Sequence, residues 1–126
     1  MNTSSALRQY QAVSTNVMVN DASPHRLIQM LMDGSLSRLA QARGALERGQ
    51  LADKGELISK TITIVSGLRG ALDMERGGEV AINLDRLYEY MSNRLIVANA
   101  KGDVQVLDEV AGLMRTIKSG WDAIAP

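Results

Sequence analysis

The single histidine, His25, is the side chain in this sequence that comes closest to known catalytic chemistry. Histidine can accept a phosphoryl group, ligate a metal or move a proton near neutral pH. A phosphotransfer histidine stands exposed in the middle of a helix, with a basic residue and a glycine close behind it. Here His25 follows Ser23-Pro24, which is typical of a helix start, and is followed by Arg-Leu-Ile. We therefore predict a surface or capping histidine, and we keep a histidine phosphotransfer-like signalling bundle as the alternative function.

Other reactive combinations of side chains are missing from the sequence. The absence of cysteine excludes disulfides, thiolate metal sites and cysteine nucleophiles. A di-iron helix bundle needs two Glu-x-x-His pairs, which one histidine cannot supply. Phosphate loops of the Gly-x-x-x-x-Gly-Lys type and Gly-x-Ser-x-Gly elbows do not occur. We predict no catalytic residues, no cofactor, no metal site and no enzyme activity.

The overall composition argues against nucleic acid or a membrane as the partner. Lys and Arg together number 14, as do Asp and Glu, so the formal charge is zero and attracts neither DNA nor anionic lipid. One Trp, three Tyr and no Phe do not make a platform on which bases could stack. No stretch approaches the roughly 20 apolar residues that span a bilayer, and we expect no secretory signal. The 126 residues are enough for one domain with a single core.

The elements that must position any binding residue are helices, because apolar side chains recur at every third or fourth position. The predicted helices span 24–49, about 52–76 and about 80–100, with a fourth from 104 onward. Ser23-Pro24 marks the first start, Gly77-Gly78 the end of the second helix, and Asp103 the cap of the fourth. Short connections favour an all-α fold, an antiparallel four-helix bundle over 23–126. Residues 1–22 have no firm helical stripe and are predicted to form a loosely structured arm.

The second predicted helix is apolar on two sides, more than one core face requires. Its core side carries Ile58, Ile62, Val65 and Leu72. A second cluster, about 100° away around the helix, comprises Leu57, Ile64, Leu68 and Ala71. Either a central position in the bundle buries both sides, or the surplus forms a groove for an amphipathic helix. Burial of Leu57, Ile64, Leu68 and Tyr90 together would favour a purely structural bundle.

Several segments resemble one known family. They are "ASPHRLIQMLMDG" (22–34), "GGEVAINLDRLYEYM" (77–91), "RLIVANAKGD" (94–103), the late Trp121 and the early Tyr10. Taken in this order, they are similar to the flagellin export chaperones of the FliS family. At Met32 the family more often has an aromatic residue.

The resemblance implies a cytoplasmic export chaperone. Such proteins bind the C-terminal segment of flagellin, prevent its premature polymerisation and deliver it to the flagellar type III export apparatus, where the loaded complex meets the cytoplasmic domain of the export gate. It also implies that an N-terminal segment with Tyr10 and Leu7 covers part of the apolar surface. We expect a monomer or weak homodimer. The expected partner-binding residues are Leu7, Tyr10, Leu57, Ile64, Leu68, Ala71, Tyr90, Val97, Val106, Leu113 and Ile117.

Overall fold

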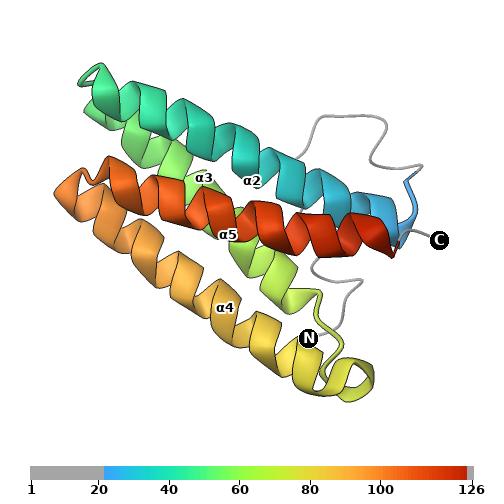
Figure 1. Ribbon diagram of the computed structural model, residues 1–126. Coiled ribbons are helices and arrows are strands. Elements are labelled where there is room, and N and C mark those ends of the chain that lie inside the picture. Colours follow the sequence, from blue (N-terminus) through green and yellow to red (C-terminus); the bar gives the residue numbers. More distant parts are fainter. Residues whose placement is uncertain (1–21, 125–126) are drawn as a thin grey trace.

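The computed structural model describes residues 22–124, which fold into an all-helical bundle without strands in this part of the chain (Figure 1). The helices are α2 (Pro24–Glu47), α3 (Leu51–Gly70), α4 (Met74–Lys101) and α5 (Val104–Ala123). Consecutive helices run antiparallel, and the four close into a ring in which α2 and α4 each pack against both α3 and α5. The predicted four-helix bundle is therefore confirmed. The predicted arm lies, except for Ala22, outside the described residues.

Two of the predicted helix starts are confirmed by their caps. The Ser23 hydroxyl accepts a hydrogen bond from the Arg26 amide at 3.1 Å, and Pro24 occupies the first turn of α2. The Asp103 carboxylate accepts from the Gln105 amide at 2.9 Å. Gly102, with φ at 63°, ends α4 in the left-handed conformation that glycine adopts without a steric cost.

The predicted boundary between the second and third helices is wrong. α3 ends at Gly70, not near residue 76, and α4 begins at Met74. The start signal is Asp73, whose carboxylate accepts from the Glu75 and Arg76 amides at 3.2 and 3.0 Å. The Gly77-Gly78 pair is not a stop but a kink inside α4, where Gly78 has φ 52° and ψ −131°. Only glycine adopts this backbone conformation without strain.

The bundle encloses one apolar core, to which all four helices contribute side chains. Its fully buried large side chains are Leu31, Met32, Leu39, Ile58, Val65, Met91, Leu95, Leu107, Val110 and Met114. Because these recur at helical spacing, each helix turns one stripe inward. Within residues 22–124, no helix combines the length and the apolarity that crossing a bilayer requires.

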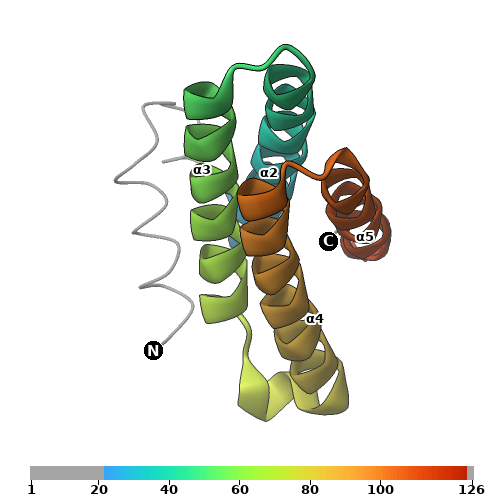
Figure 2. The same cartoon turned by 90° about the vertical axis from the view of Figure 1, so that its left-hand side faces the viewer.

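The helices diverge at one end of the bundle. α4 and α5 lie close together at their Gly102 connection and separate toward the start of α4 (Figure 1). The side view shows α3 and α4 next to each other, joined at that same end by the turn through Asp73 (Figure 2).

Candidate protein-binding groove

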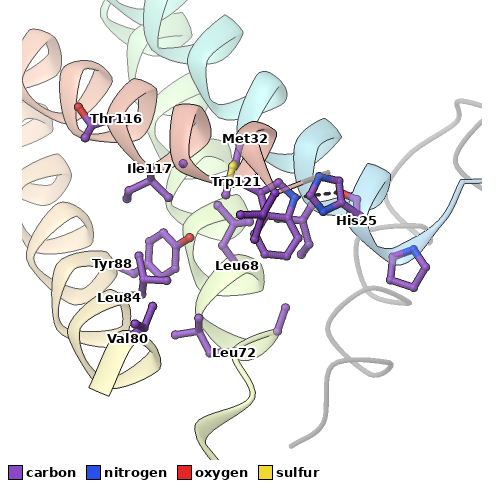
Figure 3. Close-up of a pocket in the computed structure, with 15 residues that line it drawn as sticks. His25, Met32, Leu68, Leu72, Val80, Leu84, Tyr88, Thr116, Ile117 and Trp121 are labelled. Carbon is purple, nitrogen blue, oxygen red and sulfur yellow. Dashed lines mark hydrogen bonds between the residues drawn. The ribbon is translucent and has the colours of Figure 1, made fainter. Parts of the chain in front are cut away.

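The divergent end of the bundle holds an apolar groove of about 560 Å³. It lies among the start of α2, the end of α3, the first turns of α4 and the end of α5 (Figure 3). Fifteen residues of the described part of the chain line it: Pro24, His25, Ile28, Met32, Leu68, Ala71, Leu72, Val80, Leu84, Tyr88, Thr116, Ile117, Gly120, Trp121 and Ile124. None of them is Asp, Glu, Lys or Arg. A concave surface of this size and composition is suited to apolar side chains of a partner.

Depth in the groove is graded from a buried floor to an exposed rim. Met32, Leu68 and Tyr88 are each 2% exposed and form the floor. Val80 on α4 and Ile124, the residue that follows α5, are 68% and 66% exposed and form the rim. Half-buried side chains connect the two levels: Leu72, Leu84, Ile117 and Trp121. Rim side chains of this kind gain burial only when something occupies the groove.

One wall of the groove is fixed by contacts between α2 and α5. The Trp121 indole N–H donates to the His25 carbonyl at 3.0 Å, and the two rings stack with centroids 4.5 Å apart and planes 10° apart (Figure 3). Just outside the groove, the Gln29 amide donates to Asp122 at 2.8 Å. Lys118 donates to the same carboxylate at 2.6 Å, and this hydrogen bond holds the pKa of Asp122 below its ordinary value.

The opposite wall is made by α4. Val80 and Leu84 follow the Gly78 kink directly, so the orientation of this wall depends on a backbone conformation that glycine permits. The ion pairs between α3 and α4, from Arg69 to Asp85 at 2.6 Å and to Glu89 at 2.8 Å, lie on an exposed face. The groove therefore has one braced wall and one wall that begins at a kink.

The prediction of a surface position for His25 is only partly right, because the residue is half-buried and belongs to the braced wall. Its Nε2 atom is buried and has no hydrogen-bond partner among residues 22–124, and its ring lies against Trp121. The reason is that the helix start packs against the end of α5, a contact between distant parts of the chain that local sequence does not reveal. A buried Nε2 cannot meet a phosphoryl donor at that atom without leaving the stack, which speaks against the phosphotransfer alternative.

Three of the residues predicted to bind a partner line the groove: Leu68, Ala71 and Ile117. Leu57 is half-buried and lines a second, more polar hollow between α2 and α3. Val97 and Leu113 are half-buried outside the groove, and Leu7 and Tyr10 lie outside the described residues. Tyr90 is 44% exposed, with its hydroxyl donating to Glu109 at 2.6 Å.

The expectation that the residues predicted to bind a partner form free surface is wrong for part of the set. Ile64 and Val106 are only 6% and 4% exposed, and Leu68 only 2%. They pack in the core because α3 touches both α2 and α4, and α5 touches both α2 and α4. Tyr90 and Leu57 are not buried, however, so the condition set for a purely structural bundle is not met. A binding role for the predicted residues stays a prediction.

Sequence reasoning missed most of the groove. The lining residues that it did not name as partner-binding include His25, Met32, Val80, Leu84, Tyr88, Trp121 and Ile124. Periodicity assigns a residue to a face of its helix but not to a level along the bundle. The one sequence signal that pointed to the groove was Asp73. As a helix cap it predicts that α4 begins at residue 74, and this start places the first turns of α4 beside the end of α3.

Comparison with known proteins places the chain in one family. The family described as "Flagellar protein FliS" matches residues 6–126. The chain is 62% identical over 120 residues to the flagellar secretion chaperone FliSB of Pseudomonas aeruginosa, with 95% of each chain covered. It is 47% identical over 127 residues to the flagellar secretion chaperone FliS of Salmonella typhimurium, covering all of this chain and 94% of the other. It is 45% identical over 121 residues to the flagellar secretion chaperone FliS of Vibrio cholerae, covering 96% of this chain and 89% of the other.

Proposed function

The chain belongs to the FliS family of flagellar proteins, and from this premise we propose that it is a cytoplasmic chaperone that captures the C-terminal segment of flagellin in the groove. Its relatives are flagellar secretion chaperones, so its process is flagellar export, and the family implies a role without catalysis. The observation that best supports this proposal is the uncharged lining of the groove with its exposed apolar rim.

Capture would work by covering the apolar face of the client. Flagellin's C-terminal segment is amphipathic and must later pack into coiled helices in the filament. An amphipathic helix lying in a groove exchanges contact with water for contact with apolar side chains. While it does so, the same face cannot pack into a growing filament, and premature polymerisation is blocked. Binding energy alone shifts the client toward the captured form, so no nucleotide is needed.

Residues 1–22 are proposed to compete for the same surface. Residues 1–21 precede the described part of the chain directly, and Pro24 and His25 already line the groove. With Tyr10 and Leu7 as apolar anchors, this segment would cover the groove until the client displaces it. Removing residues 1–17 should leave the helical content intact and change flagellin affinity or dimerisation. If the truncated chain unfolds, the proposal that this segment is a displaceable cover is contradicted.

Delivery completes the proposed cycle. The loaded complex, rather than the empty chaperone, would contact the cytoplasmic domain of the export gate. The protein itself would be a monomer or weak homodimer.

The test compares exposed apolar residues inside and outside the groove. Val80→Asp and Ile124→Asp change rim residues that are 68% and 66% exposed, so the fold should tolerate them. Burying a Val or Ile side chain contributes about 1.5–3 kcal/mol, so each change should weaken binding of a flagellin C-terminal peptide about 10- to 100-fold. Leu51→Asp is the control, since Leu51 is 61% exposed and begins α3 at the other end of the bundle.

Isothermal titration of the three variants and the original chain with the peptide gives the comparison. Equal losses at all three positions, or none at the rim, would remove the groove from the site. Stable phosphohistidine at His25 after incubation with a phosphoryl donor would instead revive the phosphotransfer alternative.

A further inference from the structure

The floor of the groove contains a hydroxyl group that makes no hydrogen bond within the fold. Tyr88 on α4 is 2% exposed, and its hydroxyl points from α4 into the groove, toward Leu68 (Figure 3). This hydroxyl makes no hydrogen bond within the described residues. Burial raises the pKa of Tyr88 to about 12, so the phenol is neutral at physiological pH and can both donate and accept.

The hydroxyl of Tyr88 keeps contact with water in the empty groove, because the fully buried unpaired side-chain atom among the described residues is His25 Nε2 and not this oxygen. An occupant that covered the hydroxyl without pairing it would remove this water and leave a polar group without a partner, which is unfavourable. The indole N–H of Trp121, by contrast, already donates to the His25 carbonyl at 3.0 Å. The occupant of the groove must therefore supply a partner for Tyr88 in place of water.

We propose that Tyr88 is a specificity-determining residue that hydrogen-bonds an Asn or Gln side chain placed within the apolar face of the client helix. The inference rests on the proposed capture of an amphipathic client segment in the groove and adds the polar feature by which that segment is selected. An apolar client would seal the hydroxyl off from water without pairing it. A client with a carboxamide at that position pairs it.

The uncharged lining selects a neutral partner for the hydroxyl. Among residues 22–124, no Asp, Glu, Lys or Arg lines the groove, so a client carboxylate or ammonium would lose its hydration without an opposite charge from this lining to replace it. A carboxamide carries an acceptor and two donors on a side chain without net charge. It satisfies the phenol in either direction of the hydrogen bond.

The experiment is a double-mutant cycle between chaperone and client. Tyr88→Phe is titrated with the flagellin C-terminal peptide and with peptides in which each Asn or Gln is replaced singly by Leu. Tyr88→Phe should bind the unchanged peptide 5- to 20-fold more weakly. One Leu peptide should show a similar loss with the original chain and no further loss with Tyr88→Phe, because the same hydrogen bond is removed twice. Replacing that residue by Glu should weaken binding more than Leu does.

Two measurements keep the result independent of folding. Urea unfolding of Tyr88→Phe should show nearly unchanged stability, because the hydroxyl that is removed makes no hydrogen bond within the described residues. Thr63→Val is the control hydroxyl deletion, since Thr63 is exposed on α3 and donates to the Ser59 carbonyl outside the groove. With tyrosine labelled by carbon-13 at the ring carbon that bears the hydroxyl, the Tyr88 signal of the original chain should shift when the peptide is added.

The outcomes separate this inference from the proposed function. If the original chain does not bind the peptide at all, the capture of flagellin's C-terminal segment fails. If the original chain binds the peptide, but the affinity of Tyr88→Phe stays within twofold and its effect adds independently to that of every peptide substitution, capture stands and the hydrogen bond is overturned. An equal loss in Thr63→Val, or an unshifted Tyr88 signal, would overturn it as well.

Discussion

Replacing Trp121 by Phe should weaken the bundle measurably, because this side chain ties the end of α5 to the start of α2. The indole N–H bond to the His25 carbonyl, at 3.0 Å, contributes about 0.5–1.5 kcal/mol net. Loss of the second ring removes a few tens of Å² of apolar contact, roughly another 0.5–1 kcal/mol at 25 cal/mol per Å². The stacking on His25 is kept by Phe. Together these give a free energy of unfolding lower by about 1–2.5 kcal/mol.

Urea unfolding followed by far-UV circular dichroism measures this change, since Trp121 is the only tryptophan and its fluorescence is lost in the variant. The midpoint should fall while the slope with denaturant stays the same, because the surface exposed on unfolding hardly changes. His25→Ala is the companion variant, since it keeps the carbonyl and removes only the stacked ring. A stability of Trp121→Phe within about 0.3 kcal/mol of the original chain would refute the role of the α2–α5 contact.

Three further predictions concern stability. Gly67→Ala should raise the free energy of unfolding by about 0.5–1 kcal/mol, because an added Cβ meets nothing within 4 Å and alanine favours the helix; a lower value would contradict this, and weaker client binding in the same variant would reveal a close backbone approach. Gly78→Ala should lower it by about 1–3 kcal/mol, because φ of 52° with ψ of −131° strains an L-residue; an unchanged urea midpoint would count against the kink. Hydrogen bonds from Tyr90 and then Arg94 hold the pKa of Glu109 below its ordinary value, so its contribution to stability is present above the unfolded-state pKa and lost as pH falls through the folded one. Between about pH 5 and about pH 3, the original chain should therefore lose more stability than Glu109→Gln, and parallel pH profiles would refute the coupling.

Local signals in the sequence were sufficient for the fold class and for most helix boundaries. Ser23-Pro24 and Asp103 lie where their side chains cap α2 and α5, because a cap depends on the next three residues only. The error at Gly77-Gly78 has a physical cause. Two glycines stop a helix or kink it according to what packs on either side, and the deciding cap at Asp73 was not recognised.

The groove was less predictable, because it depends on how helices diverge. Helical periodicity correctly gave α3 two apolar sides, but it could not tell that Ile64 is enclosed by neighbours while Leu68 reaches the groove floor. The position of the rim residue Val80 depends on the kink at Gly78. The position of Trp121 depends on a contact with His25, at a helix start almost a hundred residues earlier. Such distances along the chain carry no periodic signal.

The most direct test of groove capture is a methyl-resolved NMR titration of the full chain with the flagellin C-terminal peptide. The account predicts that the largest shifts fall on the groove methyls of Leu72, Val80, Leu84, Ile117 and Ile124, while Leu51 at the opposite end stays unchanged. Shifts confined to Leu57 and Val97, with the groove methyls unmoved, would contradict it.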